Sequence, residues 1–575
     1  MNNYNQKIKM KKNAVALVLF SLYFSLSVNA KIKSPLKNNI DKTISVSVPA
    51  PDSKTDGTLS NVWVSDNGDG TYKNPVLNAD YSDPDAIRVG DDYYLVSSSF
   101  NCVPALPILH SKDLVNWKIV NSVFTQQQPL DVFNKPQHGN GVWAPAIRYH
   151  KGEFYIFYPD PDFGIYVVKT RNILGKWNEP ILIMPGKGLI DPCPLWDEDG
   201  KAYLVHGFAG SRAGIKNILA VCKMSVDGTK ILDEGTIVYD GHDNHETVEG
   251  PKFYKRNGLY YLMLPAGGVP TGYQLILRSK NIYGPYEEKI VLAQGNTPTN
   301  GPHQGAWIET QTGESWFLHF QDKGAYGRVV HLEPVKWVAG WPIMGNDSDG
   351  DGKGEPVLVY KKPNVGKIWP IATPATSDEF NSQLGLQWQW HANFKNWWAF
   401  PVASKGVLRM YTVGAPSNFV NMADVPNLLL QKFTAEEFSA TTKVIFNTSK
   451  TTKTGEKFGL IVMGHDYAYV GLKKVDNKLF ITQATCNEAT KQGLEKEIET
   501  IDTSSKSAFF RVKVSKGGIC NFSYSLNGST FTPIGKPFTA KPGGWIGAKV
   551  GLFCMRSEFI NDPGFADVDW FRIEK

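Results

Sequence analysis

The stretch SDPDAIRVGDDYYLV, residues 82–96, runs from an acidic Asp-Pro step through a short apolar segment and a glycine turn at Gly90 to an aromatic pair. A single Asp beside a proline is usually no more than a turn former. The same order of features recurs, however, at intervals of about fifty to sixty residues, a period typical of propeller blades. The further copies are WAPAIRYHKGEFYIF (143–157), DPCPLWDEDGKAYLV (191–205), EGPKFYKRNGLYYLM (249–263) and GPHQGAWIETQTGESWFL (301–318).

Each copy has the pattern of a β-hairpin, with a short strand, a turn at a glycine and a second strand of β-favouring aromatic residues. More strand-like segments follow within a unit, such as FGIYVVKT (163–170) and YQLILRSK (273–280), and no long window shows a helical period. The sequence therefore predicts an all-β fold. Residues 71–361 are expected to form a five-bladed β-propeller in which the first strand of every blade lines the central axis.

The N-terminus has the pattern of a secretory signal peptide over residues 1–30. Four lysines precede the apolar run AVALVLFSLYFSLSV (14–28), and small residues stand at a cleavage site before Lys31. Cleavage lowers the formal net charge of +6 by these four lysines, to +2, so neither nucleic acid nor an anionic membrane is expected as a partner. We expect an exported protein, periplasmic or secreted, with an N-terminal extension at 31–70 and without membrane insertion.

The C-terminal third has a different sequence pattern. Prolines mark a linker at 362–376, and residues 377–575 alternate short strands with turns, which favours a β-sandwich of the jelly-roll or concanavalin-like kind. The chain has six cysteines without Cys-x-x-Cys spacing, which excludes a disulfide scaffold and argues against a zinc site. Buried free thiols and individual disulfides both remain open.

Three of the five copies place a carboxylate at the equivalent blade position, namely Asp83, Asp191 and Glu249. Trp143 and His303 occupy this region of the other two copies. Like charges that converge on one axial funnel raise one another's pKa, which is costly unless the site uses them. Hydrolysis of a glycosidic bond needs a protonated acid and an ionised carboxylate, and a third carboxylate can keep the pKa of the acid high. The high aromatic content, 12 %, suits sugar binding as well as β-structure.

Six motifs in the first 360 residues together resemble glycoside hydrolase family 43, in its β-xylosidase and α-L-arabinofuranosidase branch. The resemblance implies a five-bladed propeller that inverts anomeric configuration, and LGLQWQW (384–390) resembles the concanavalin-like C-terminal domain of this branch. The motifs are YSDPDAIRVGDDYYLVSSSF, GVWAPAIRYHKGEFYIFY, LIDPCPLWDEDGKAYLVHG, VEGPKFYKRNGLYYLM, GPHQGAWIET and GRVVHLEPVKW.

The resemblance also implies roles for the three carboxylates. Asp83 corresponds to the general base, Asp191 to the residue that orients the acid and modulates its pKa, and Glu249 to the general acid. Asp85 departs from the serine that is commoner after the Asp-Pro step, while the base position itself is intact.

Five further residues are implied in substrate binding. Phe100 and Trp143 match aromatic walls of the sugar pocket, and Trp545 matches an aromatic that reaches over its mouth from the sandwich. His303 matches a histidine near the pocket floor, and Arg328 a residue that hydrogen-bonds sugar hydroxyls. Ordinary packing or solvation is the alternative for each of them.

No cofactor is expected to be required. Acids alternate in NDSDGDGKGEP (346–356) as in an EF-hand loop, but flanking helices and a well-placed terminal Glu are missing, which favours a surface turn. Some family members hold calcium near the position of His303. A structural calcium ion is therefore left open, and no metal ligand is assigned.

The sequence favours an exo-acting, inverting glycoside hydrolase that releases a terminal β-D-xylose or α-L-arabinofuranose from plant cell-wall oligosaccharides and polysaccharides. A non-catalytic carbohydrate-binding propeller and an endo-acting arabinanase are the alternatives. The choice between xylose and arabinose, the natural glycan and the oligomeric state stay open, because they depend on loop shapes and surfaces that no motif records.

Overall fold

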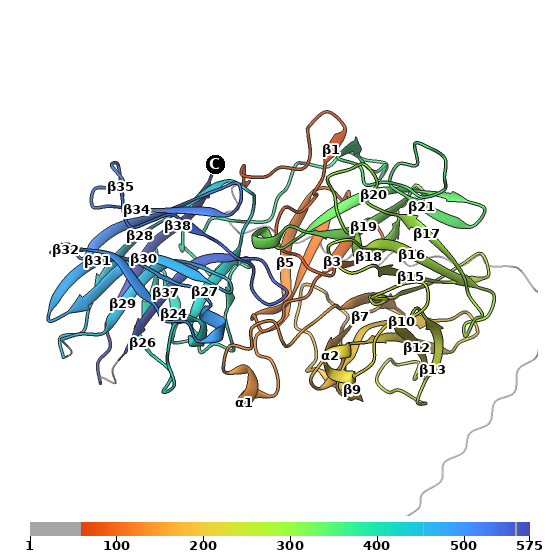
Figure 1. Ribbon diagram of the computed structural model, residues 1–575, viewed down its shortest axis with the longest axis horizontal. Coiled ribbons are helices and arrows are strands. Elements are labelled where there is room, and N and C mark those ends of the chain that lie inside the picture. The colour runs from red at the N-terminus through yellow and green to blue at the C-terminus, as the bar shows by residue number, and fades with distance from the viewer. Residues whose placement is uncertain (1–58, 452, 558–560) are drawn as a thin grey trace, which may run out of the picture. The chain divides into compact units, whose positions relative to one another are not determined.

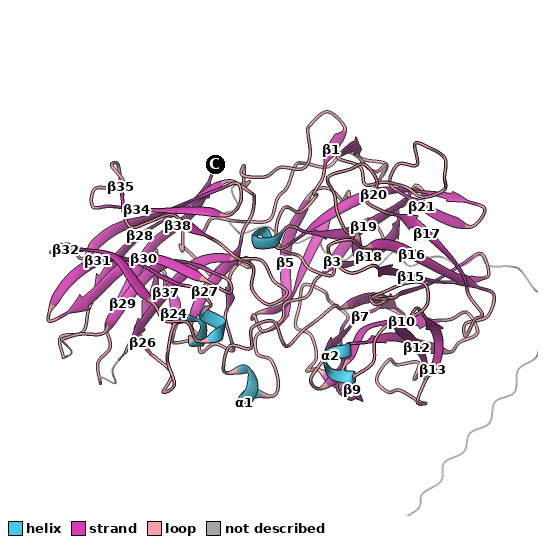
Figure 2. Ribbon diagram, viewed as in Figure 1, coloured by secondary structure: helices cyan, strands magenta, loops and turns pink. Residues whose placement is uncertain are grey.

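The structure, a computed structural model, describes residues 59–451, 453–557 and 561–575. The predicted signal peptide and the part of the predicted N-terminal extension before Leu59 lie outside the described residues. Strands dominate both parts of the described chain, and the helices are single turns such as α1 (Leu130–Phe133) and α2 (Gly210–Ala213) (Figure 2). In the described ranges, no helix is long and apolar enough to cross a membrane.

Five four-stranded antiparallel sheets follow one another along the chain, which confirms the prediction of a five-bladed propeller (Figure 1). In each sheet the strands are adjacent in chain order. The blades are β2 (Asp85–Val89), β3 (Asp92–Val96), β4 (Ala105–Ser111) and β5 (Trp117–Phe124); β6 (Ala146–His150), β7 (Glu153–Asp160), β8 (Gly164–Thr170) and β9 (Ile181–Pro185); β10 (Leu189–Trp196), β11 (Ala202–Phe208), β12 (Ile218–Met224) and β13 (Thr236–Asp240); β14 (Lys252–Arg256), β15 (Leu259–Ala266), β16 (Tyr273–Ser279) and β17 (Glu287–Leu292); and β18 (His303–Glu309), β19 (Ser315–Asp322), β20 (Arg328–Val338) and β21 (Trp341–Met344).

The first strands are neighbours from blade five through blade one to blade four, and blades four and five meet through β15 and β18. Strand β2 contacts both β6 and β18, and β10 contacts both β6 and β14. The turn between β2 and β3 shows why the repeat needs its glycine: Val89 pairs with Asp92, so Gly90 is in a two-residue hairpin loop, with φ 63°. The residues just before the first strands are thereby brought to one end of the axis.

The two ends of the propeller are joined by a small antiparallel sheet. Strand β1 (Thr71–Lys73) pairs with β22 (Val359–Lys361). The side chain of Asn74 then accepts a hydrogen bond from the Leu332 amide and donates to the Leu332 and Val357 carbonyl groups. These contacts hold the start of the described chain against blade five.

Two eight-stranded sheets form the C-terminal part, which confirms the predicted β-sandwich. Alternate apolar side chains of both sheets, such as Val444, Leu460, Phe510 and Leu552, pack into one buried core. One sheet holds β23 (Gln389–Trp390), β27 (Leu428–Lys432), β37 (Lys549–Arg556), β29 (Glu456–Met463), β30 (Tyr467–Val475), β31 (Lys478–Cys486) and β32 (Lys496–Thr503), with β26 (Val413–Gly414) on β37; the other holds β24 (Ala399–Val402), β25 (Val407–Tyr411), β38 (Phe565–Glu574), β28 (Phe438–Asn447), β33 (Ser507–Ser515), β34 (Ile519–Ser525) and β35 (Thr532–Pro533), with β36 (Phe538–Thr539) on β34.

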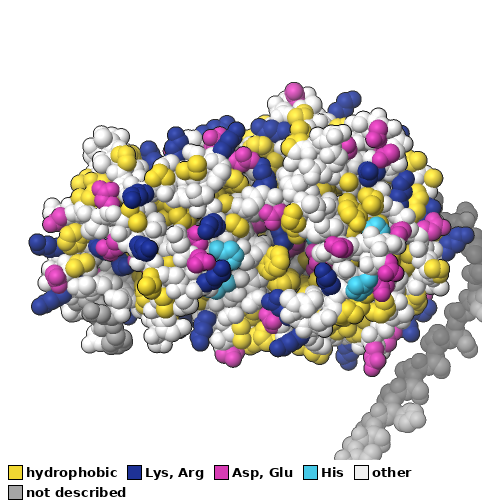
Figure 3. Space-filling model, in the orientation of Figure 1, with side chains coloured by type: hydrophobic (Ala, Val, Ile, Leu, Met, Phe, Trp, Pro, Cys, Tyr) yellow, Lys and Arg dark blue, Asp and Glu magenta, His cyan; other side chains and the backbone are white. Residues whose placement is uncertain are grey.

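The six cysteines all lie in the described residues, and each is a buried free thiol. This resolves the alternative that the sequence leaves open between thiols and disulfides. Charged side chains of both signs are interspersed over the face drawn in Figure 3, without a large patch of one sign on that face.

Candidate active site

The structure brings the three predicted carboxylates to one cavity of about 190 Å³. Asp83 lies two residues before β2 of blade one, Asp191 lies near the start of β10 in blade three, and Glu249 precedes β14 of blade four. Asp83 and Asp191 both have φ 55°, a left-handed conformation that non-glycine residues rarely adopt. Such strained residues persist only where the surrounding structure holds them, and they concentrate at functional sites.

Asp83 is buried and surrounded by donors. Its Oδ2 accepts hydrogen bonds from the Ser82 hydroxyl at 2.8 Å and the Ser98 hydroxyl at 2.5 Å. Its Oδ1 accepts from Nη1 of Arg328 at 3.0 Å. Because an ionised carboxylate only accepts, these three donors match the charged form of Asp83.

Asp191 and Glu249 are neighbours on adjacent blades, and burial raises the pKa of both carboxyls. The Gly250 amide donates to Oδ2 of Asp191 at 2.7 Å, which opposes the shift by favouring its ionised form. For Glu249, burial and then the nearby Asp191 charge raise the pKa to about 8. The proton that this pair holds at neutral pH therefore belongs on Glu249.

Arg328, the first residue of β20, contacts both Asp83 and the ring of Trp545. Its Nη1 donates to the Ser82 hydroxyl and Asp83, and its guanidinium lies 5.7 Å from the centre of the Trp545 ring. Its buried Nε has no hydrogen-bond partner among the described residues. This Nε lies 3.9 Å from Oδ2 of Asp322, beyond hydrogen-bond distance, so the Arg328 side chain lies between Asp83 and Asp322.

Phe100, Trp143 and Trp545 line the same cavity. The rings of Trp143 and Trp545 meet edge to face, with centroids 6.0 Å apart, and the indole N–H of Trp143 donates to the Gly139 carbonyl at 2.8 Å. Trp545 is large and apolar but 55 % exposed, so part of its ring is open to solvent.

His303 lies behind Glu249 and is not part of the cavity lining. Its Nε2 is 3.4 Å from Oε1 of Glu249, and neither ring nitrogen has a hydrogen-bond partner in the described chain. Burial, and then the Arg328 charge, lower the pKa of His303 to about 3, so the imidazole is neutral. His303 therefore lies close to Glu249 and next to the lining residue Gln304, without lining the cavity itself.

The cavity also contains residues that the sequence did not single out. Lys216, Ser211 and Gln304 line it, and Oε1 of Gln304 is buried without a partner in the described ranges. Gln304 follows His303 directly in the fifth copy of the repeat, which is the one signal that pointed to it. Ser211 lies in α2 and Lys216 follows this helix. Both residues are outside any copy of the repeat.

Two acids close to Asp83 in the chain, Asp80 and Asp85, hold neighbouring segments together. Asp85 accepts hydrogen bonds from the Ile147 amide and from Arg148, at 2.8 and 2.6 Å, and so joins blade one to blade two. Asp80 accepts from the Arg328 amide at 2.9 Å and from the Gly547 amide of the sandwich at 3.0 Å. Of the three acids in this turn region, only Asp83 lines the cavity.

Trp545 is held over the cavity by backbone contacts between the sandwich and the propeller. Besides the Gly547 contact, the Ala548 amide donates to the Ala325 carbonyl at 2.7 Å. A Cβ atom at Gly139 would stand 2.3 Å from the Gly544 carbonyl oxygen, so a larger residue does not fit there. The segment around Trp545 is therefore closely docked on the propeller.

Two other groups of side chains in the described residues have the composition of metal ligands. Asp347, Asp349 and Asp351 bring carboxylate oxygens within 4.8 Å of one another, in a partly exposed loop whose own amides bind them. His319, His331 and Glu333 form a buried cluster inside blade five. Calcium prefers six to eight oxygen ligands, and the one imidazole of His303 beside Glu249 does not offer such a set. No step of the chemistry is assigned to a metal.

The comparisons with known proteins agree with this geometry. Residues 377–574 match the β-xylosidase C-terminal concanavalin A-like domain, and residues 72–342 match glycosyl hydrolases family 43. A β-xylosidase of Formosa agariphila is 34 % identical over 556 residues, which cover 88 % of this chain and 90 % of that protein. The chain belongs to glycoside hydrolase family 43.

As a member of family 43 the protein is an O-glycosyl hydrolase. Another relative, a non-reducing end α-L-arabinofuranosidase of Bacteroides ovatus, is 28 % identical over 538 residues, covering 87 % of this chain and 94 % of that one. The crystal structure of a family 43 protein from Bacillus licheniformis superposes with a TM-score of 0.75 at 28 % identity, over 88 % of this chain and 99 % of that chain.

Proposed function

We propose that this protein is an exo-acting, inverting glycosidase that removes a terminal β-D-xylose or α-L-arabinofuranose from xylan-derived chains. One observation carries the proposal: a small cavity holds an ionised carboxylate at Asp83 opposite a carboxyl at Glu249 that stays protonated near neutral pH. The names of the two relatives, a β-xylosidase and an α-L-arabinofuranosidase, support both pentoses as substrates.

The mechanism follows from the proton states. Glu249 donates its proton to the glycosidic oxygen of the leaving group, while Asp83 removes a proton from a water that attacks the anomeric carbon. Asp191 keeps the pKa of Glu249 high through its own negative charge. Arg328 and the two serine hydroxyls hold Asp83 in place.

Inversion is supported by the position of the two carboxylates in the ring. Asp83 and Glu249 start the first and fourth of five blades, so they are not on neighbouring blades. An inverting enzyme needs about 6.5–9.5 Å between its carboxyl groups to seat a water, whereas a retaining enzyme needs about 5–5.5 Å. Non-adjacent blades favour the wider gap.

Exo-action is supported by the size and closure of the cavity. Its volume of about 190 Å³ is below the roughly 300–1,000 Å³ of pockets for drug-sized ligands. Trp545 and Trp143 stand together at this cavity, which suits one terminal sugar ring better than a chain that passes through. An endo-acting arabinanase needs an open groove instead.

The experiment is a panel of p-nitrophenyl glycosides, followed by proton NMR of the first turnover on the best one. Release of xylose or arabinofuranose with inverted anomeric configuration is expected. Glu249→Gln should abolish hydrolysis of xylobiose, whereas Glu246→Gln, an exposed glutamate on the same segment, should leave it unchanged. A first product that keeps the substrate's configuration would force Asp83 to be a nucleophile, and full activity of Glu249→Gln would remove the assigned acid.

Export and partner are part of the same proposal. We infer that residues 1–30 direct the protein to the periplasm or the medium, where xylo- or arabino-oligosaccharides are its substrates. N-terminal mass spectrometry of the exported protein tests this, and a chain that still begins at Met1 would contradict it.

A further inference from the structure

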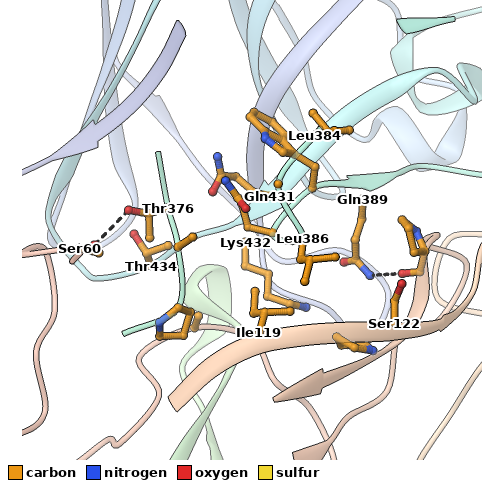
Figure 4. A pocket seen from close by; sticks show the side chains of 18 of the residues that line it. Ser60, Ile119, Ser122, Thr376, Leu384, Leu386, Gln389, Gln431, Lys432 and Thr434 are labelled. Carbon is orange, nitrogen blue, oxygen red and sulfur yellow. Dashed lines mark hydrogen bonds between the residues drawn. The ribbon is translucent and has the colours of Figure 1, made fainter. Parts of the chain in front are cut away.

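A second cavity in the described chain is larger than the one that holds the carboxylates. Its volume is about 680 Å³, and propeller residues such as Ile119 and Ser122 face sandwich residues such as Leu384 and Gln431 across it (Figure 4). Among the described residues, the two cavities share no lining side chain. A volume of this order is within the roughly 300–1,000 Å³ typical of ligand sites.

Polar groups in this cavity lack partners. Gln431, on β27, is 2 % exposed, and neither its amide nitrogen nor its amide oxygen finds a hydrogen bond within the described residues. The buried hydroxyl of Thr434 lacks one as well. A buried amide without a partner is destabilising, because it has given up its hydrogen bonds to water without a replacement. Such groups are therefore expected to meet a ligand or ordered water, and here they line a space large enough for a ligand.

The charge of the lining points to a neutral ligand. Lys432 is the one charged side chain among the described residues that line the cavity, and in Figure 4 it extends toward Ile119. Its amine lies 5.2 Å from the centre of the Tyr81 ring, and burial lowers its pKa to about 8. An anionic ligand would find one weak cation here, and a cationic ligand would find no carboxylate in the described lining.

The walls are mostly apolar and rich in aromatic side chains, including Trp63, Trp388, Phe394 and Phe400. A sugar chain combines apolar C–H faces, which pack on aromatic rings, with hydroxyl groups that both donate and accept. The unpartnered amide of Gln431 needs one donor and one acceptor, and a sugar hydroxyl can supply either.

We propose that this cavity is a second, non-catalytic binding site for a neutral pentose oligosaccharide. The sugar class rests on the proposed function, while the existence of the site rests on the unpartnered groups and the uncharged lining. Such a site would hold one part of a glycan chain away from the carboxylates.

Isothermal titration of xylohexaose into the Glu249→Gln variant tests the proposal, because that variant should bind the ligand without cleaving it. Gln431→Leu, in the same background, replaces the amide with an apolar group of similar size. It should not lower the melting temperature, because it removes an unpaired polar group. Thr434→Val serves as a second, isosteric variant.

The matched control is Gln483→Leu on β31. Gln483 is also buried, with both amide atoms unpartnered in the described chain, but it lies outside this cavity. Glu249→Gln is expected to show two binding events, and Gln431→Leu should weaken one of them about tenfold or more. Gln483→Leu should change neither.

The outcomes separate this proposal from the proposed function. Two binding events that both keep their affinity in Gln431→Leu and Thr434→Val overturn the second site. A single binding event that keeps its affinity in these variants overturns it as well. The same holds if no binding is seen at all. A single event that Gln431→Leu removes supports the second site and counts against sugar binding at the carboxylates. Equal weakening by Gln431→Leu and Gln483→Leu would show a general structural effect and also overturn the proposal.

Discussion

Replacing Asp191 with asparagine tests the assigned proton states most directly. Glu249 acts as an acid only while protonated, so its pKa sets the alkaline limb of the rate profile. Burial and the Asp191 charge together raise that pKa from 4.5 to about 8. A like charge disfavours ionisation of its neighbour, so removing it lowers the pKa of Glu249 and lets this group lose its proton at lower pH.

The size of the shift follows from the two causes. Burial is the larger cause and is unchanged in the variant, so the pKa that sets the alkaline limb should remain above the ordinary pKa of a glutamate. A charge close enough to interact directly shifts a pKa by about 1–3 units. We therefore expect the alkaline limb of kcat/KM to move down by about one pH unit or more, with a lower maximum because the Gly250 amide then faces a neutral side chain.

The assay is the pH dependence of kcat/KM for xylobiose, whose leaving group needs protonation. Asp199→Asn is the control, since this aspartate follows Asp191 in the same copy of the repeat but is exposed. An alkaline limb that stays in place or moves up in Asp191→Asn would refute the assignment of Asp191 as modulator. A shift of equal size in Asp199→Asn would refute the argument from proximity.

Three further predictions concern other parts of the site. Glu249→Ala should reduce hydrolysis of xylobiose about a hundredfold or more while sparing aryl xylosides with very acidic leaving groups, which need little protonation; equal loss on both substrates, measured by kcat, would contradict the acid role. Trp545→Ala should raise KM for xylobiose with little change in kcat, since the ring lines the cavity but lies on the sandwich; an unchanged KM would argue against a contact with the substrate. Asp80→Asn should also raise KM for xylobiose, by no more than Trp545→Ala does. Asparagine keeps an acceptor for the Arg328 amide but loses the acceptor for the Gly547 amide. A fall in kcat without a rise in KM would show that Asp80 acts through Asp83 instead.

The period of the repeat is the reason that so much of the fold and of the site could be predicted. Each copy marks a hairpin, and equivalent positions in a ring of blades converge on one axis, so Asp83, Asp191 and Glu249 could be grouped without any knowledge of side-chain contacts. For His303 the repeat predicted the position of the backbone only. It starts the first strand of blade five as expected, but its side chain packs behind Glu249. A repeat predicts the place of a backbone segment and not the direction of each side chain.

The contacts that support the site could not be predicted, because they join segments far apart in the chain. Asp80 binds Gly547, a residue 467 positions later, and no spacing rule links the two. Asp85 was visible only as a departure from a common serine, and its meaning depends on Arg148 in the next blade. Pairwise tertiary contacts of this kind leave no periodic trace in a single sequence.

The contacts of Asp80 connect the sandwich to the carboxylate cavity, although none of the three carboxylates lies on the sandwich. One carboxylate oxygen of Asp80 holds the backbone of Arg328, whose side chain holds Asp83, and the other oxygen holds the segment that bears Trp545. Asp83 and the segment of Trp545 are therefore both positioned through one buried side chain. Glycines at 139 and 544 let the two backbones approach closely at the same place. Residues of both folded parts line this cavity, with Trp545 from the sandwich among them, so it is complete only when the two parts are in contact.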